Sequence, residues 1–282
     1  MWRAGSFARV RAMEAGESGQ FALTIRRAVI EQSYRAHVGH IGSALSIADL
    51  LEAVFRSSDS LGEEEDPDRD RFVLSKGHAA LALYAALMAA GRLSPATLAT
   101  FCADGGELGV HPEPTIAGVD FGTGSLGQGL PMAVGAALAG RWQRSARRVF
   151  ALISDAECNE GSTWEAAMFA AHHRLGNLTA LLDLNGQQAL GYTEEVIDLP
   201  ELPVAWRAIG WHVRDVDGHD VEALVAALAE AAEEERPTLM VARTTFGKGV
   251  TFMEGKIPWH YWPLSDEQYG QAMAELGVVA AA

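Results

Sequence analysis

Residues 154–161 read Ser-Asp-Ala-Glu-Cys-Asn-Glu-Gly, and residues 183–188 read Asp-Leu-Asn-Gly-Gln-Gln. An apolar run, 149–153, precedes the first stretch, and the second stretch follows another apolar run, 178–184. The intervening residues are small and amphipathic, which is typical of a helix. The pattern predicts a strand–helix–strand unit, in which two parallel strands end at the same edge of a sheet.

One oxygen ligand stands just after each predicted strand. Asp155 and Asn185 are 185 − 155 = 30 residues apart, the length of such a unit. We expect the two side chains to meet and to hold one divalent cation between them. Mg²⁺ prefers a few protein oxygens together with phosphate oxygens. The pattern therefore favours a Mg²⁺-bridged diphosphate as the ligand.

The bulk composition restricts the classes of function. The chain has 282 residues, 49% of them hydrophobic, enough for a substantial core in one large domain or two small ones. A net charge of −15 argues against a nucleic-acid-binding surface. The two cysteines, Cys102 and Cys158, form no disulfide framework, and no apolar window approaches the ~18 residues of a membrane span. We expect a cytoplasmic protein that binds neither nucleic acid nor membrane.

Periodicity and turn residues indicate the order of elements. Residues 1–20 contain arginines but no apolar core, so we expect a flexible N-terminal extension and no secretory signal. Helices are predicted over 21–36, 45–55, 79–90, 129–141 (buried), 162–174 and 221–235, with a short one opening at Ser94-Pro95. Strands are predicted over 72–74, 149–153, 178–184, 211–216 and 238–244. Loops are predicted over 57–71, 101–124, 191–203 and 247–264. This alternation indicates an α/β fold, a parallel sheet flanked by helices.

Four histidines lie in loops or at element ends, where functional residues concentrate. They are His40, His78, His111 and His260. Neutral imidazoles hydrogen-bond hydroxyl groups and move protons near pH 7. A structural role stays open for each of them. Zinc is the weaker interpretation, because no two show close ligand spacing on one helix face and no cysteine pair accompanies them.

Two further features stand at predicted helix starts. Gly124-Ser-Leu-Gly-Gln-Gly129 would let backbone N–H groups approach an anion, although no clear strand leads into it as in a dinucleotide site. Glu160 and Glu165 flank Gly161 and the next helical turn. These carboxylates serve either the positive end of the helix dipole or a site or interface.

Taken together, these motifs resemble the N-terminal, diphosphate-binding half of transketolase, from about residue 21 to the C-terminus. The motifs, in order, are His37-Val-Gly-His-Ile-Gly-Ser43, Leu74-Ser-Lys-Gly-His78, Gly109-Val-His-Pro-Glu113, Gly122-Thr-Gly-Ser-Leu-Gly-Gln-Gly129, Asp155 with Glu160 and Glu165, Asp183-Leu-Asn-Gly186, and Trp259-His260. The resemblance implies a thiamine-diphosphate-binding fold of the PP type, with residues 21–282 as a single domain.

The resemblance also implies roles for individual residues. Asp155, Asn185 and the backbone carbonyl of Gln187 would ligate Mg²⁺. The cofactor would be lined by His78, Gly124, Ser125, Leu126, Asp155, Ala156, Glu157, Asn185 and His260. The catalytic set would be His40, His78, His111 and His260, facing sugar hydroxyls and the reacting carbonyl. Glu160 and Glu165 would lie at the subunit contact that links two active sites.

The implied activity is transfer of a two-carbon ketol unit from a ketose or ketose phosphate to an aldehyde. Family members carry a second domain with the cofactor-activating glutamate, and this chain ends at Ala282. The resemblance therefore implies a separate C-terminal subunit, an α₂β₂ assembly, and no activity of this chain alone.

Alternatives stay open. The chain could belong to another thiamine-diphosphate enzyme, such as a 2-oxo acid dehydrogenase or a C–C bond former of specialised metabolism, or it could be a non-catalytic scaffold of its partner. Ala156 replaces a family glycine, and it would be strained if its φ were positive. Segments 186–191 and 259–262 also depart from the family, so we do not expect the ordinary pentose-phosphate substrates.

Overall fold

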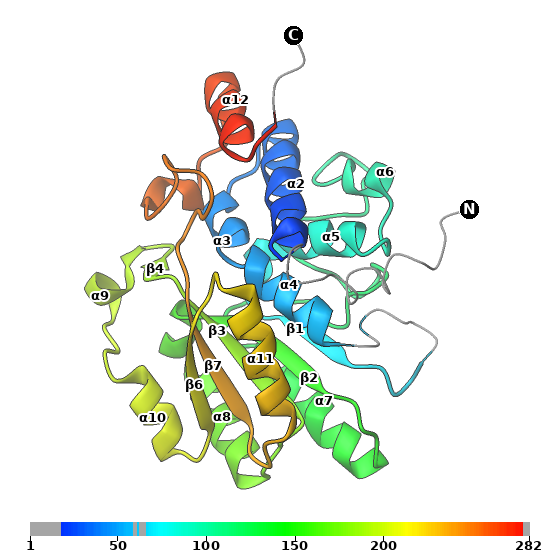
Figure 1. The fold of residues 1–282 in the computed structure, drawn as a ribbon, viewed down its shortest axis with the longest axis vertical. Coiled ribbons are helices and arrows are strands. Elements are labelled where there is room, and N and C mark those ends of the chain that lie inside the picture. The colour runs from blue at the N-terminus through cyan, green and yellow to red at the C-terminus, as the bar shows by residue number, and fades with distance from the viewer. Residues whose placement is uncertain (1–17, 59–60, 62–65, 279–282) are drawn as a thin grey trace.

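A parallel sheet of five strands forms the centre of the computed structural model, which describes residues 18–58, 61 and 66–278. The strand order is β1-β2-β3-β7-β6 (Figure 1). The strands are β1 (Arg71–Leu74), β2 (Val149–Ser154), β3 (Leu178–Leu184), β6 (His212–Asp217) and β7 (Thr238–Arg243). All four pairings are parallel, as the alternation of strands and helices predicts.

Strand residues alternate between two hydrophobic cores. In β2, Phe150 and Leu152 belong to one core, whereas Ala151 and Ile153 belong to the other. Both faces of the sheet are thus covered by helices, which explains why the strands are continuous apolar runs in the sequence. The polar groups that end these strands are carried to one edge of the sheet.

Helices cover both faces of the sheet. The first core contains α2 (Gln20–Ala36), α3 (Ile41–Ser46), α4 (Ala48–Ser57), α5 (Ala80–Ala89), α6 (Pro95–Leu98), α11 (Val221–Ala232) and α12 (Asp266–Glu275). The second contains α7 (Gly129–Gln143), α8 (Gly161–His172) and α10 (Leu202–Ala208). In Figure 1, α11 crosses the near face of the sheet, and α8 lies behind it.

The predicted strands and most helices are confirmed within a few residues. β3 spans the predicted residues 178–184, and Ser94 caps α6 by accepting a hydrogen bond from the Thr97 N–H at 2.9 Å. The predicted extension, 1–20, falls mostly on residues 1–17, which lie outside the described residues.

Two predictions of local structure were wrong, and one helix was not predicted. The helix predicted over 45–55 is two helices, α3 and α4, separated at Ile47, where the backbone leaves helical geometry (φ −97°, ψ 3°) without a glycine or proline. The loop predicted over 191–203 contains half of a small hairpin, β4 (Gln187–Gln188) with β5 (Gly191–Tyr192), then α9 (Thr193–Val196) and the start of α10. Finally, α12 is a helix where no element was predicted.

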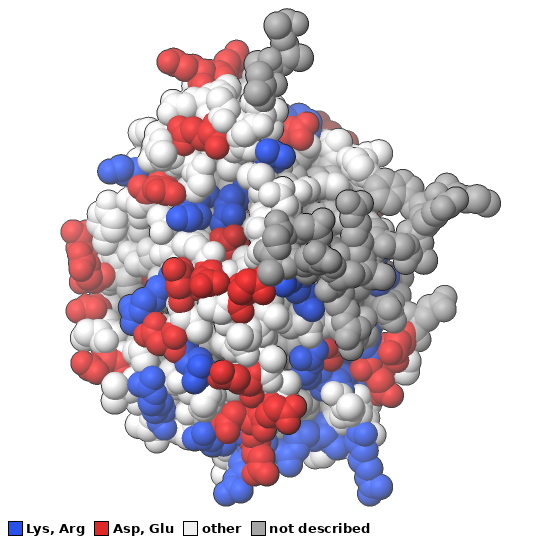
Figure 2. All heavy atoms as spheres, in the orientation of Figure 1, with Lys and Arg blue, Asp and Glu red and all other residues white. Residues whose placement is uncertain are grey.

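The small-residue helix α7 was expected to be buried, and only its sheet-facing side is. Leu130 and Ala137 are buried, but Gly135 is exposed and Trp142 is 78% exposed. Figure 2 shows acidic and basic side chains interspersed on one face of the molecule, without a continuous basic patch there. Among the described helices, none combines the length and apolar character that a membrane crossing requires.

Candidate active site

The carboxyl ends of four neighbouring strands bring polar residues to one edge of the sheet. Lys76 follows β1, Asp155 follows β2, Asn185 follows β3 and Thr244 follows β7. The edge is at the ends of parallel strands, where open α/β sheets bind their ligands. This confirms the placement that the strand–helix–strand pattern predicts for Asp155 and Asn185.

Asp155 is buried and joined to the segment that carries Asn185. Its Oδ2 accepts hydrogen bonds from the Gly186 N–H at 3.0 Å and from the Thr193 hydroxyl at 2.9 Å. Burial and the neighbouring negative charge of Asp183 raise the pKa of Asp155 to about 6. An environment that raises the pKa of a carboxyl group is one in which a cation would stabilise the ionised form.

The amide of Asn185 is held in one orientation. Its Nδ2 donates to Asp183 Oδ2 at 2.8 Å, and its Oδ1 accepts from the Gln187 N–H at 2.9 Å. Gln187 itself begins β4 and is buried. Two of the predicted metal ligands, Asn185 and Gln187, therefore lie in one hydrogen-bonded segment. Gly186 of that segment contacts the third, Asp155.

A buried ion pair that the sequence patterns did not reveal supports this segment. Lys76 Nζ lies 2.5 Å from Asp183 Oδ2, with side-chain exposures of 1% and 0%. Ser46 donates to the same carboxylate at 2.9 Å, and Thr244 donates to its other oxygen. One feature of the sequence indicates such a pair. Asp183 is the single charged residue within the apolar strand Leu178–Leu184, and a buried charge requires a partner.

The charges and donors at this edge fit a divalent cation. Three buried carboxyl groups, those of Asp155, Glu157 and Asp183, gather around one buried ammonium, that of Lys76. Across the described residues, no group of three or more His, Cys, Asp and Glu side chains is arranged to hold a metal. The predicted set of one carboxylate, one amide oxygen and one backbone carbonyl is instead the oxygen set with which Mg²⁺ combines phosphate oxygens.

Three of the four predicted histidines converge above this edge. The ring centroids of His40 and His78 are 5.2 Å apart, and His260 lies 6.3 Å from the first and 6.2 Å from the second. His40 adopts a left-handed backbone conformation (φ 61°) before α3. His78 Nε2 lies 3.1 Å from Ser43 Oγ, and His260 ends the 3-10 turn η4 (Ile257–His260).

The environment favours neutral imidazoles. Burial, followed by the positive charge of Lys76, lowers the pKa of His260 to about 4. Burial first and then nearby positive charges also lower the pKa values of His40 and His78. Among the described residues, neither ring nitrogen of His260 has a hydrogen-bond partner, and Nδ1 of His40 has none. Buried nitrogens without partners are suited to hydrogen bonding with a ligand.

His111 lies on the exposed side of the same group. A Cβ atom at Gly124 would be 3.1 Å from the His111 ring, which places this ring against the glycine loop. The Tyr84 hydroxyl donates to the His111 carbonyl at 2.9 Å and fixes the backbone there. All four predicted histidines therefore border the region between the glycine loop and the strand ends.

The glycine loop, residues 124–127, is tied to the Asp155 segment by Glu157. Glu157 lies in the 3-10 turn η3 (Ala156–Asn159) and is fully buried. It accepts hydrogen bonds from the Gly127 N–H at 2.9 Å, from the Ser154 N–H at 3.0 Å and from the Ser75 hydroxyl. Ser125 is exposed and Leu126 partly exposed, so both are accessible to a ligand.

Ala156 is not strained. It begins η3, and its φ is not positive, unlike that of His40 and four other non-glycine residues in the described chain. Alanine would be unfavourable here only with a positive φ, so it causes no backbone strain at this position.

Glu160 and Glu165 lie on the rim and not among the histidines. Both are exposed on the chain considered alone, and Glu160 packs against the glycine loop, because a Cβ at Gly127 would lie 2.6 Å from its Cβ. Met168 and Phe169, farther along α8, are 51% and 43% exposed. Carboxylates and exposed apolar side chains thus share the outer face of α8.

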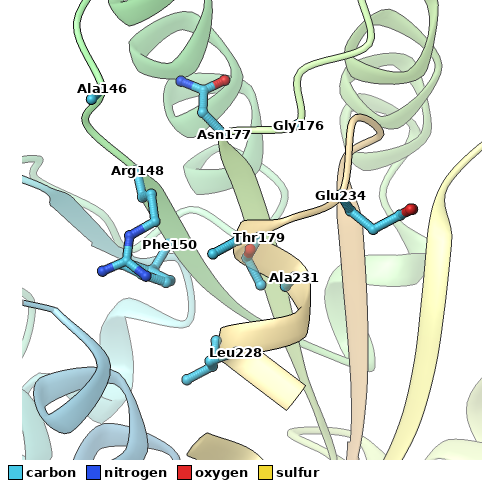
Figure 3. Close-up of a pocket in the computed structure, with 10 residues that line it drawn as sticks. Ala146, Arg148, Phe150, Gly176, Asn177, Thr179, Leu228, Ala231 and Glu234 are labelled. Atoms are coloured by element: carbon cyan, nitrogen blue, oxygen red, sulfur yellow. The ribbon is translucent and has the colours of Figure 1, made fainter. Parts of the chain in front are cut away.

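A separate hollow lies at the opposite, amino-terminal edge of the sheet. Figure 3 shows Arg148, which precedes β2, with Phe150 of β2 and Thr179 of β3, beside Leu228 and Ala231 of α11. The Arg148 guanidinium is already paired with Asp70 at 3.0 Å and stacks over Phe150. This hollow contains no group of reactive side chains, so the carboxyl-terminal edge remains the candidate site.

Comparison with known proteins agrees with this placement. Residues 18–281 match the family described as transketolase, thiamine diphosphate binding domain. A 6-deoxy-6-sulfo-D-fructose transketolase subunit from Clostridium sp. (strain MSTE9) is 40% identical over 259 residues, which cover 90% of this chain and 94% of that protein. An apulose-4-phosphate transketolase subunit from Phocaeicola vulgatus is 36% identical, with coverage of 89% and 90%.

A solved structure shares the fold. The transketolase of Campylobacter jejuni superposes with a TM-score of 0.88 at 30% identity, over 94% of this chain and 43% of that one.

Proposed function

Because the chain belongs to the transketolase family, with its thiamine-diphosphate-binding fold, we propose that it is the cofactor-binding subunit of a two-component transketolase. In this proposal it transfers a two-carbon ketol unit from a ketose or ketose phosphate to an aldehyde, together with a separate C-terminal subunit. In the same proposal, residues 21–282 are a single thiamine-diphosphate-binding domain. Free thiols at Cys102 and Cys158 suit a cytoplasmic location.

One observation carries the chemical part of the proposal. Asp155 and Asn185 lie at the same sheet edge as a group of histidines, and within the described chain His40 and His260 have buried ring nitrogens without partners. A metal-bound diphosphate and a polyhydroxylated substrate are the two ligand types that these groups suit. A plain nucleotide-binding domain would have no need of the histidines.

The proposed cofactor site uses the residues at the strand ends. Thiamine diphosphate, when bound, supplies the carbon nucleophile and the electron sink for C–C bond cleavage. Asp155, Asn185 and the Gln187 carbonyl would hold Mg²⁺ against its diphosphate. Gly124, Ser125 and Leu126 would line the diphosphate from the glycine loop, and Glu157 would fix that loop relative to Asp155.

The histidines would manage substrate protons. His40, His111 and His260 would hydrogen-bond substrate hydroxyls and the reacting carbonyl, and His78 would border both cofactor and substrate. In a neutral imidazole, one ring nitrogen donates a hydrogen bond and the other accepts one. The ring can therefore give a proton to a substrate oxygen or take one from it. The low pKa values of His40, His78 and His260 keep them in this neutral form at pH 7.

The proposed assembly rests on the names of two relatives and on side chains that this chain exposes. The two relatives that match over 94% and 90% of their own lengths are both named transketolase subunits. The outer face of α8 exposes Met168 and Phe169 in the same helix as Glu165, and Glu160 is exposed just before that helix. An exposed apolar patch of this kind is typical of an interface. We propose an α₂β₂ complex with this face at the subunit contact.

Reconstitution tests the proposal. The purified chain is mixed with a transketolase C-terminal-type subunit, thiamine diphosphate and Mg²⁺, and ketol transfer to an aldehyde acceptor is measured. The mixture should be active and each chain alone inactive. Activity of this chain alone would refute the two-component assembly, and decarboxylation of a 2-oxo acid without ketol transfer would indicate a different thiamine-diphosphate enzyme.

Calorimetry separates an enzyme from a scaffold. The assembled complex should bind thiamine diphosphate saturably when Mg²⁺ is present, and Asp155→Ala should abolish that binding. Absence of saturable binding in the wild-type complex would instead favour a non-catalytic partner.

A further inference from the structure

A buried ionic cluster lies outside the candidate site. Asp49 of α4 accepts two hydrogen bonds from the Arg26 guanidinium, at 3.1 and 2.5 Å, and its Oδ2 lies 2.7 Å from Nδ1 of His219. The three side chains come from α2, α4 and the turn before α11. Although burial opposes ionisation, the hydrogen bonds from His219 and Arg26 hold the pKa of Asp49 below its ordinary range.

The contacts of His219 determine which ring nitrogen carries the proton. The backbone N–H of Thr245 points at Nε2 from 2.8 Å, and a backbone N–H only donates. Nε2 must therefore accept, so the proton is on Nδ1 and is donated to Asp49. The imidazole thus connects a buried carboxylate to one specific backbone amide.

That amide belongs to the segment that leaves β7, residues 244–250, which we call the exit loop. The cluster holds this loop at two points. His219 accepts from the Thr245 N–H, and Arg26 Nε donates to the Lys248 carbonyl at 3.1 Å. Asp49 orients both holding side chains, so a single carboxylate controls two points that are three residues apart in the exit loop.

The exit loop in turn contacts the candidate site. The Phe246 ring lies against the His260 ring, with centroids 4.6 Å apart, and it also packs closely on Gly42, where a Cβ would be 2.0 Å from the ring. The Thr244 hydroxyl donates to Asp183, the carboxylate that orients Asn185. Displacement of the loop would therefore move a histidine and release one support of a predicted metal ligand.

We propose that Arg26, Asp49 and His219 form a positioning cluster that sets the exit loop, and through it the placement of His260 and Asp183. His219 is its central member, since it is the only one of the three that bonds the loop next to both Thr244 and Phe246. The positioning itself concerns this chain alone, whereas its consequence for ketol transfer rests on the function proposed above.

Nuclear magnetic resonance on the full chain tests the positioning without any assumption about activity. Long-range ¹H–¹⁵N spectra of histidine side chains should show His219 with its proton on Nδ1. Phe246→Leu removes the ring current of Phe246 and so gives the reference positions of the His260 ring-proton signals without it. In His219→Phe, which keeps a planar ring but neither donor nor acceptor, these signals should shift toward the reference positions. His219→Gln retains a donor and an acceptor and should shift them less.

The matched control breaks an ion pair between α4 and α11 without touching the exit loop. Arg56 of α4 lies 2.7 Å from Glu222 of α11. Glu222→Gln should leave the His260 signals in place. Equal shifts in Glu222→Gln and His219→Phe, unchanged His260 signals in a folded His219→Phe, or a wild-type His219 with its proton on Nε2 would each overturn the proposal.

Activity of the assembled enzyme provides the second measurement. A misplacement of about 1 Å costs roughly 100-fold in rate, so His219→Phe should lower kcat/KM by about 10- to 100-fold, with partial rescue in His219→Gln and full activity in Glu222→Gln. A wild-type complex without ketol transfer would refute the proposed function, and the histidine spectra would still decide the positioning.

Discussion

Asn185 donates a hydrogen bond from Nδ2 to Oδ2 of Asp183 at 2.8 Å, two residues earlier in the chain. The same oxygen lies 2.5 Å from Lys76 Nζ. Asp183 thus serves two purposes: it pairs with a fully buried ammonium group, and it fixes the orientation of the Asn185 amide, whose oxygen accepts from the Gln187 N–H.

Asp183→Asn separates these two purposes. The substitution removes the carboxylate that pairs directly with the buried Lys76 ammonium and should lower the free energy of unfolding by about 3–5 kcal/mol. It should also weaken binding of thiamine diphosphate with Mg²⁺. Adding Lys76→Met removes the unpaired charge, so the double variant should recover most of the stability and little of the binding. Chemical denaturation and calorimetry measure the two effects. Full recovery of binding in the double variant would contradict a role in orienting Asn185.

Glu157→Gln should loosen the glycine loop. The wild-type carboxylate accepts only from donors, including the Gly127 and Ser154 N–H groups, whereas a glutamine amide turns an NH₂ group toward one of them. We expect a loss of about 1–3 kcal/mol in unfolding free energy and weaker cofactor binding. Glu165→Gln, at an exposed position on α8, is the matched control and should be within about 0.5 kcal/mol of wild type. A stable Glu157→Gln chain would show that the loop is held by other contacts.

Assembly should respond to the exposed glutamates while the chain itself does not. Glu160 and Glu165 are exposed on the chain alone, so the double Gln substitution should leave its unfolding free energy nearly unchanged. Sedimentation of the complex should nevertheless show a higher dissociation constant. Glu233→Gln, exposed at the end of α11, should not affect assembly. Unchanged dissociation of the double variant would place the subunit contact elsewhere.

The buried histidines should make the chain less stable in mild acid, while Asp155, whose folded pKa is raised to about 6, acts in the opposite direction. The folded pKa of His260 is about 4, below its ordinary 6.5. Between these values the unfolded chain binds a proton that the folded chain does not, so unfolding free energy decreases as pH falls from about 6.5 to about 4, by about 3 kcal/mol for this one group. His40 and His78 act in the same direction. Urea unfolding across this range should show a smaller slope for His260→Gln, whereas replacement of exposed His172 should preserve it.

Ala156→Gly tests whether the alanine impairs the site. Since Ala156 has no positive φ, glycine relieves no strain and should cost about 0.5–1 kcal/mol through backbone entropy. Thiamine diphosphate affinity should change little. A large gain in affinity would mean that the methyl group obstructs the diphosphate.

The sequence predicts the sheet and the position of its polar edge well, for a physical reason. Strands buried on both faces are long apolar runs, so β3 is recognisable over its full length, and a polar residue just after such a run must lie at a strand end. Asp155 and Asn185 are of this kind. The motifs likewise identify the histidines, because each stands among glycines or at an element boundary.

Contacts between distant segments are not visible in such patterns. The break between α3 and α4 at Ile47 has no glycine or proline to mark it, and α12 is stabilised by packing onto α2. Lys76 appears in a recognised motif, but its pairing with Asp183, 107 residues away, depends on β1 and β3 flanking β2. The Asp49–His219 contact, 170 residues apart, is equally beyond local reasoning.

The strand order has a consequence for the folding of the chain. β7 lies between β3 and β6, so β6 has no partner in the sheet until β7 has been made and inserted. Thr244 and Phe246, which follow β7, reach Asp183 and His260 only at that step. Closing such long-range contacts is slow. During synthesis, the ligand-binding edge is therefore completed only after β7 has been made, and a ligand that binds only the finished edge would selectively stabilise chains that have reached this stage of folding.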